Sequence, residues 1–246
     1  MARAVRYLRP FWLFYGGKWR AVPRYPMPKY GTIVEPFAGA AGYSTRYHSR
    51  LVTLNDKDPQ IASLWRWLVL VGPEQILALP DLEVGQTTDD LEVCSEARAL
   101  IGFWLKPAQS VPGKSPSSWY RDAAAHHLVW GERVRQRIAQ QVSKIRHWNV
   151  SCGSYDDLPN IEATWFIDPP YQEAGKHYRH GSKGINYQHL AAFCRSRKGQ
   201  VIVCENAGAT WLPFEPFARI QAATTKAGSK TSSEAVWFQP APLRLL

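Results

Sequence analysis

The residues best suited to chemistry form the tetrapeptide Asp168-Pro169-Pro170-Tyr171, which directly follows an apolar stretch at 164–167. The exocyclic amine of a nucleobase is a poor nucleophile, because its lone pair is delocalised into the ring. Asp168 could accept one amine hydrogen and the carbonyl of Pro169 the other, and proline contributes no competing N–H donor. Tyr171 offers a flat face on which an extruded base could stack. The motif thus predicts catalysis by positioning and electrostatics.

A second group of residues could hold a nucleotide-like ligand. The stretch 32–35 reads as a buried strand, and the small-residue turn with Gly39 and Gly42 that follows would let the backbone approach a ligand closely. Asp56, at the end of the next strand, could bind the two hydroxyls of a ribose. A nicotinamide dinucleotide site follows similar logic, but Phe37 occupies the place of the first glycine, so that fingerprint is incomplete.

Strands alternating with helices must position these residues, which predicts an α/β fold with a parallel sheet. Asp58 reads as an N-cap and Pro59 as the first residue of a helix that continues to about Val71. Thr88 is a plausible N-cap for a second helix, with the stripe Leu91, Cys94, Ala97, Ile101 and Leu105, and a third begins near Glu132 with the stripe Val134, Ile138, Val142 and Ile145. The expected strands are 32–35, 51–54, 149–152, 164–167, 200–204 and 235–238.

The composition favours an anionic partner. The 246 residues carry 30 Lys and Arg against 20 Asp and Glu, a formal net charge of +10. Residues 1–34 hold seven basic side chains and no acid, whereas residues 74–97 hold seven acids and no base. This asymmetry favours nucleic acid, with the acidic stretch facing away from it.

Several classes of protein are disfavoured. No apolar run approaches the ~20 residues of a membrane span, and no signal peptide is recognisable. The four cysteines lack CxxC spacing and the histidines lack metal-ligand spacing. We therefore expect reduced thiols, no metal site and a cytoplasmic protein of a bacterial or phage-infected cell.

The segments EPFAGAAG (35–42), LND (54–56) and FIDPPY (166–171) together resemble the S-adenosylmethionine-dependent DNA adenine N6-methyltransferases of the Dam type. The stretch YGGK at 15–18 resembles the N-terminal motif of that family. The resemblance covers most of 12–60 and 147–206 and the final strand, with the motifs in the α-type order. It implies a Rossmann-like class I methyltransferase sheet from 1–71 and 149–246, with a small, mainly helical target-recognition insertion at 72–148.

The resemblance also implies roles for individual residues toward S-adenosylmethionine. Phe37 and Gly39 would lie along its methionine part, and Lys18 would approach the carboxylate with Tyr15 nearby. Tyr155 would lie against the adenine, Asp56 would hold the ribose, and Glu35 and Asp168 complete the expected cofactor site.

Recognition of double-stranded DNA is expected from the stretch between Lys106 and about Arg137. This stretch departs from the family, because residues 103–114 stand where Dam proteins carry a segment of the type RYN..G.FNVPFG, which leaves the target sequence open. The basic loop 175–181 could close over a flipped base. Candidate DNA contacts are Lys114, Arg121, Arg133, Arg135, Arg137, Lys176 and Arg179, with Gln109, Ser117 and Ser118 near base edges.

The residues leave four alternatives open. N4-cytosine methylation needs the same two acceptors, and RNA could replace DNA as the substrate. A catalytically silent DNA-binding module is a third reading, against which the intact Asp168 and Tyr171 argue. A nicotinamide-dependent oxidoreductase is the fourth.

Overall fold

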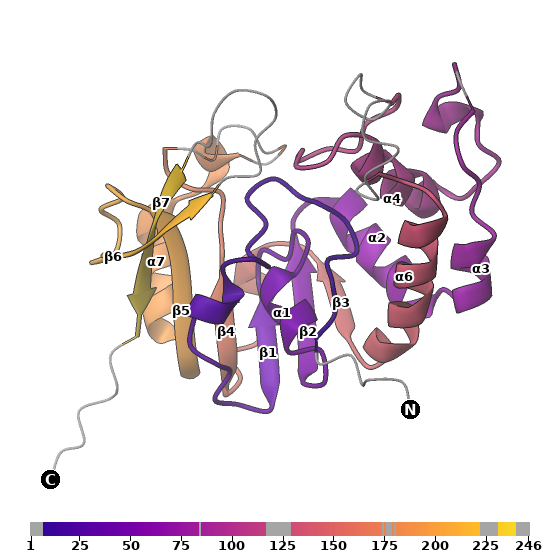
Figure 1. The fold of residues 1–246 in the computed structure, drawn as a ribbon. Coiled ribbons are helices and arrows are strands. Elements are labelled where there is room, and N and C mark those ends of the chain that lie inside the picture. The colour runs from indigo at the N-terminus through magenta and orange to yellow at the C-terminus, as the bar shows by residue number, and fades with distance from the viewer. Residues whose placement is uncertain are drawn as a thin grey trace, which may run out of the picture.

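A seven-stranded sheet forms the centre of the molecule (Figure 1). The computed structural model describes residues 7–83, 85–116, 129–173, 175, 179, 181–221 and 231–239. The strand order is β3-β2-β1-β4-β5-β7-β6. The strands are β1 (Thr32–Glu35), β2 (Leu51–Asp56), β3 (Asn149–Cys152), β4 (Ala163–Ile167), β5 (Gly199–Asn206), β6 (Glu215–Gln221) and β7 (Thr231–Phe238).

The first five strands of this order are parallel, and β7 runs antiparallel to both β5 and β6. Chain connections lead outward from β1 on one side and from β4 on the other, so the strand order reverses between these two. The expectation of an α/β fold with a Rossmann-like class I methyltransferase sheet is confirmed.

Alternation along the strands builds a separate core on each face of the sheet, because successive side chains in a strand point to opposite faces. Ile33 of β1 and Phe166 of β4 belong to the core that contains α1 (Gly42–Arg46), α2 (Pro59–Leu70) and the segment 8–25. Val34 and Trp165 belong to the other core, which α7 (Tyr187–Ser196) covers. Figure 1 shows α1 in front of the sheet and α7 behind it.

Residues 72–148 contain α3 (Pro73–Leu77), α4 (Ser95–Leu105) and α6 (Glu132–Val142), which lie with α2 beside the β3 edge (Figure 1). These helices share the core on the α1 face. The ring centroid of Trp12 lies 4.8 Å from that of Trp65 and 5.7 Å from that of Phe103. The indole of Trp104 donates a hydrogen bond to the carbonyl of Phe11. The N-terminal segment therefore joins these helices to the sheet.

The predicted helix starts are right at Asp58 and Glu132 and wrong at Thr88. The Asp58 carboxylate accepts the backbone N–H of Gln60 at 2.9 Å, as an N-cap does. Around Thr88 the side chains of Thr87 and Asp90 close a single 3-10 turn, Thr88–Asp90, and α4 begins only at Ser95. Within the described ranges, no helix is long and apolar enough to cross a membrane.

Candidate functional site

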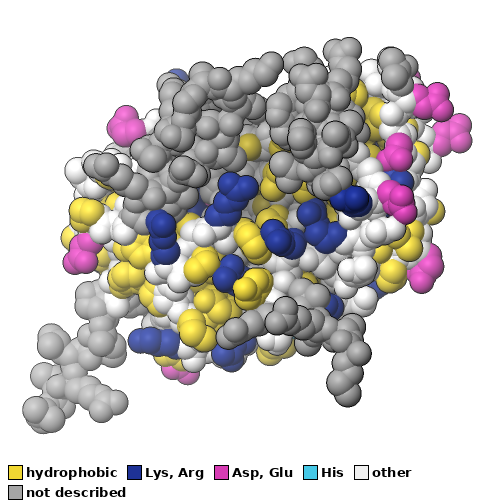
Figure 2. Space-filling model, in the orientation of Figure 1, with side chains coloured by type: hydrophobic (Ala, Val, Ile, Leu, Met, Phe, Trp, Pro, Cys, Tyr) yellow, Lys and Arg dark blue, Asp and Glu magenta, His cyan; other side chains and the backbone are white. Residues whose placement is uncertain are grey.

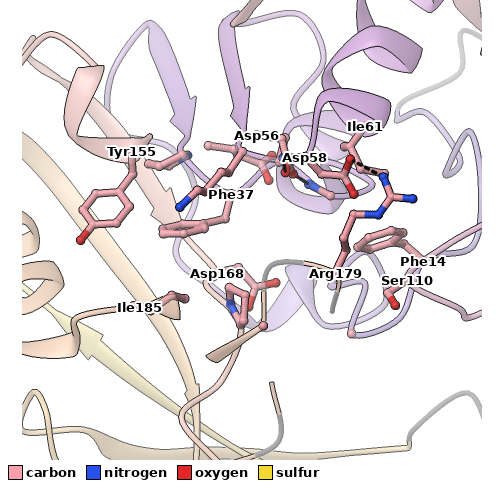
Figure 3. A pocket seen from close by; sticks show the side chains of 18 of the residues that line it. Phe14, Phe37, Asp56, Asp58, Ile61, Ser110, Tyr155, Asp168, Arg179 and Ile185 are labelled. Carbon is pink, nitrogen blue, oxygen red and sulfur yellow. Dashed lines mark hydrogen bonds and ion pairs between the residues drawn. The ribbon is translucent and has the colours of Figure 1, made fainter. Parts of the chain in front are cut away.

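A cavity of about 840 Å³ opens at the carboxyl ends of β1, β2 and β4 (Figure 3). This is the edge where open α/β sheets bind ligands, at the point where the strand order reverses. The segments that line it are 14–18, 35–42, 56–58, 153–156, 181–186 and the residues Ile61, Ser110, Phe166, Asp168, Pro170, Arg179 and His189.

The glycine turn after β1 is tied to the end of β2 through one carboxylate. The Oδ2 atom of Asp56 accepts the N–H of Gly39 at 2.9 Å, and its Oδ1 atom accepts the N–H of Asp58 at 2.9 Å. Burial is the main cause that raises the pKa of Asp56 to about 6. A carboxylate has roughly four lone-pair sites, so Asp56 retains acceptor capacity toward the cavity.

The YGGK segment packs directly on the first turn of α1. A Cβ atom on Gly42 would lie 2.6 Å from the backbone nitrogen of Trp19, so only glycine allows this approach. This packing places Lys18, the residue before Trp19, on the wall of the cavity. Tyr15 also lines the cavity.

Glu35 also lines the cavity, and its side chain holds α1 in place. Its carboxylate accepts the N–H of Ser44 at 2.7 Å, and it is 2% exposed. Burial raises its pKa to about 8.

Asp168 meets the ammonium of Lys18 at the end of β4. The Nζ atom of Lys18 lies 3.0 Å from Oδ1 of Asp168 and 4.0 Å from Oε2 of Glu234, and it donates to the carbonyl of Gly16 at 2.8 Å. Burial is the largest cause that raises the pKa of Asp168 to about 6, Lys18 lowers it, and Glu234 raises it. The sequence motif placed Lys18 beside the cofactor, whereas the structure also brings it to the proposed catalytic carboxylate.

The other residues of the tetrapeptide lie differently from Asp168. Among the described residues, Asp168 and Pro170 line the cavity, but Pro169 and Tyr171 do not. The carbonyl of Pro170 accepts the hydroxyl of Tyr187 at 2.6 Å. The hydroxyl of Tyr171 donates to Glu234, and its ring centroid lies 4.7 Å from Nζ of Lys18. The ring expected to stack on a base is therefore anchored at its hydroxyl end.

Phe37, Tyr155 and Ile185 lie together on one side of the cavity, as Figure 3 shows. The ring centroids of Phe37 and Tyr155 are 5.3 Å apart with an interplanar angle of 37°. The hydroxyl of Tyr155 lies 3.0 Å from Nδ1 of His189, and Oδ1 of Asp156 lies 3.6 Å from the same nitrogen. This apolar slot with polar groups at its rim suits a flat heterocycle.

Three carboxylates of the site have structural contacts that sequence reasoning did not find. Asp58 forms an ion pair with Arg179, at 3.3 Å, in addition to capping α2 (Figure 3). Glu205, at the end of β5, accepts the N–H of Gln172 at 2.7 Å and so fixes the chain just after the tetrapeptide. Side chains alternate along β7, so Glu234 lies on the same face as the buried Val236. An acid at such an inward-facing position was the sequence signal that could have identified it.

The candidate DNA contacts are scattered. Lys114 pairs with Asp89, Arg135 with Asp81, and Arg179 with Asp58, while Arg133 is exposed. Arg121 and Lys176 lie outside the described residues. Arg137, also expected to contact DNA, turns away from solvent: its guanidinium carbon lies 4.9 Å from the ring centroid of Trp104, and burial lowers its pKa to about 10.

The thiols and histidines complete the description. All four cysteines are free. Within the part of the chain that the structure describes, no group of three or more His, Cys, Asp or Glu side chains could hold a metal ion.

No family model matches the chain, and no curated protein matches it either. Among solved structures, a conserved hypothetical protein of Streptococcus pyogenes is similar over 92% of this chain and 94% of that chain, with 10% identity and a TM-score of 0.39. A protein of Escherichia coli named "Putative methyltransferase yhhF" is similar over 85% of this chain and 76% of that chain, with 9% identity and a TM-score of 0.35.

Proposed function

We propose that this chain is an S-adenosylmethionine-dependent methyltransferase that acts on the N6 amine of a flipped adenine in double-stranded DNA. The observation that carries the proposal is Asp168. Its carboxylate stands at the carboxyl end of β4, on the wall of the cavity and next to the ammonium of Lys18. The motif that follows it is the one whose chemistry suits an exocyclic amine.

Several features of the cavity support S-adenosylmethionine as its ligand. Its volume of about 840 Å³ lies within the range of roughly 300–1,000 Å³ typical of small-molecule sites. The slot of Phe37 and Tyr155 would take the adenine, and the carboxylate of Asp56 would accept the ribose hydroxyls. The glycine turn and Lys18 would face the methionine part, where a positive side chain favours the carboxylate.

Bound S-adenosylmethionine supplies an electrophilic methyl group on a sulfonium. The chain has to orient the amine of the base toward it and receive the amine's hydrogens. Ionised Asp168 would accept one N–H, which favours a localised nitrogen lone pair. The carbonyl of Pro169, the second acceptor that the motif predicts, does not line the cavity among the described residues. As the new N–C bond forms, the S–CH3 bond of the sulfonium would break and the neutral thioether would leave with its electron pair. The amine proton would then pass to Asp168 or to solvent. Lys18 supports this role because its charge favours the ionised carboxylate.

The charge of the molecule supports nucleic acid as the substrate. Figure 2 shows Lys and Arg side chains spread over the face that carries residues 7–30 and α1, while Asp and Glu lie around its edges, mostly near α3 and α4. A basic face of this kind attracts the phosphate backbone and releases counterions on binding. DNA rather than RNA follows from the resemblance in the sequence motifs.

The test uses methyl-tritiated S-adenosylmethionine with mixed-sequence duplex DNA and, separately, with RNA. We compare the wild-type protein with Asp168→Ala and with Glu162→Ala, which removes an exposed acid that precedes the opposite end of β4. We expect label in DNA with wild type and Glu162→Ala, and none with Asp168→Ala. Equal label with Asp168→Ala, or label in RNA alone, would overturn the proposal.

A further inference from the structure

Glu234 is a buried carboxyl group that neither the cavity nor the sequence motifs account for. It belongs to β7, which lies between β5 and β6 (Figure 1), and it is 6% exposed. A buried acid is costly unless hydrogen bonds or an opposite charge compensate for its lost hydration. The contacts of Glu234 therefore indicate why an acid occupies this position.

Two contacts of the Glu234 side chain lead to the carboxyl end of β4. Its Oε2 atom accepts the hydroxyl of Tyr171, and the same atom lies 4.0 Å from Nζ of Lys18. Lys18 in turn lies 3.0 Å from Asp168. Glu234 thus reaches Lys18, which contacts the proposed catalytic carboxylate, and Tyr171, which follows that carboxylate in the sequence.

We propose that Glu234 is a positioning residue for methyl transfer, which holds the hydroxyl of Tyr171 and the ammonium of Lys18 so that Asp168 faces the target amine in a fixed geometry. This inference rests on the proposed function, because it assigns a role in that reaction. It does not require Glu234 to touch the substrate or the cofactor, and among the described residues it does not line the cavity.

The charges around Asp168 give the inference a measurable consequence. Lys18 is the cation closest to Asp168 among the described residues, whereas the carboxyl groups of Glu234, Glu205 and Glu35 face it from β7, β5 and β1. Tyr171, Tyr25 and Cys204 are further titratable groups that interact with it. Because Glu234 raises the pKa of Asp168, neutralising Glu234 without removing its acceptor oxygen should lower that pKa.

The experiment compares Glu234→Gln, Glu234→Ala, Tyr171→Phe and the double variant of Glu234→Ala with Tyr171→Phe. Glu215→Gln, which neutralises an exposed acid on the neighbouring strand β6, is the matched control. The readouts are kcat against pH for DNA methylation and the Kd of S-adenosylmethionine by calorimetry. A merely structural role would leave the pH profile of kcat unchanged.

We expect Glu234→Gln to move the acid limb of the kcat profile to lower pH by roughly half a unit or more. Glu234→Ala should lower kcat by about tenfold or more, since a small displacement of a positioned group is costly. Tyr171→Phe should cost less in the Glu234→Ala background than in wild type, because both changes remove the same hydrogen bond. The cofactor Kd should stay within about twofold for Glu234→Gln.

An unshifted acid limb in Glu234→Gln, or fully additive losses in the double variant, would overturn the inference. Should Glu234→Ala fail to fold, Glu234→Gln alone decides. Carboxyl ¹³C titration of aspartate-labelled protein, with Asp168→Asn for assignment, follows Asp168 without any substrate. If wild type methylates nothing but Glu234→Gln still lowers the pKa of Asp168 in this titration, the proposed function fails and the coupling between Glu234 and Asp168 stands. If the pKa of Asp168 is the same in Glu234→Gln and wild type, the coupling is refuted whatever the activity.

Discussion

Replacement of Glu35 by glutamine should stabilise the protein at alkaline pH and leave it nearly unchanged at pH 5. The carboxyl of Glu35 is buried at the end of β1, and burial raises its pKa from 4.5 to about 8. Between these two values the unfolded chain ionises Glu35 and the folded chain does not, so the stability falls as pH rises. Above about pH 8 the loss is complete.

The size of the effect follows from the pKa difference between 4.5 and about 8. Each unit corresponds to about 1.4 kcal/mol, so the full loss is roughly 5 kcal/mol as an upper bound. Glutamine retains an oxygen that can accept the N–H of Ser44, and it carries no charge at any pH. The free energy of unfolding of Glu35→Gln should therefore exceed that of wild type by an amount that grows from pH 5 to about pH 8 and is constant above it.

The assay is urea unfolding followed by the fluorescence of the 11 tryptophans at pH 5, 7 and 9. Glu92→Gln, which neutralises an exposed acid, is the control and should track wild type throughout. A difference between Glu35→Gln and wild type that does not change with pH would refute the reasoning.

Three further predictions concern the site. The kcat/KM of methylation should fall about tenfold per pH unit below about pH 6, because Asp168 must be ionised to accept an amine hydrogen and its pKa in the free protein is about 6. A kcat/KM that stays flat down to pH 5 would contradict this. Gly42→Ala should cost roughly 1–3 kcal/mol of stability, since its Cβ would lie 2.6 Å from the nitrogen of Trp19, whereas Gly31→Ala, with nothing within 4 Å, should cost far less in thermal unfolding. Phe37→Ala should raise the cofactor Kd roughly tenfold or more by loss of stacking, which calorimetry measures, and a Kd equal to that of wild type would remove Phe37 from the adenine slot.

Six of the seven strands and the gathering of the site residues could be predicted from the sequence, because these depend on local signals, whereas β6 (Glu215–Gln221) is not among the expected strands. The strand 149–152 coincides with β3, and Asp58 followed by Pro59 marks the start of α2. Once the strands are placed in a parallel sheet, their carboxyl ends must share one edge, and Asp56 and Asp168 both line the cavity there.

Other features depend on partners that are distant in the sequence. Glu234 faces inward because Tyr171 and Lys18, 63 and 216 positions earlier in the chain, meet it across the sheet. Arg137 turns away from solvent because Trp104 of α4 supplies an aromatic face. No local sequence pattern predicts these contacts between residues that are distant in the chain.

The most direct test of the central claim is the identity of the methylated nucleoside. Duplex DNA is incubated with trideuteromethyl S-adenosylmethionine and the protein, digested to nucleosides and analysed by mass spectrometry. We predict labelled N6-methyladenine with wild type and no labelled nucleoside with Asp168→Asn, although calorimetry should show that this variant still binds the cofactor. Label on the N4 amine of cytosine, no labelled nucleoside with wild type, or equal label with Asp168→Asn would contradict the account.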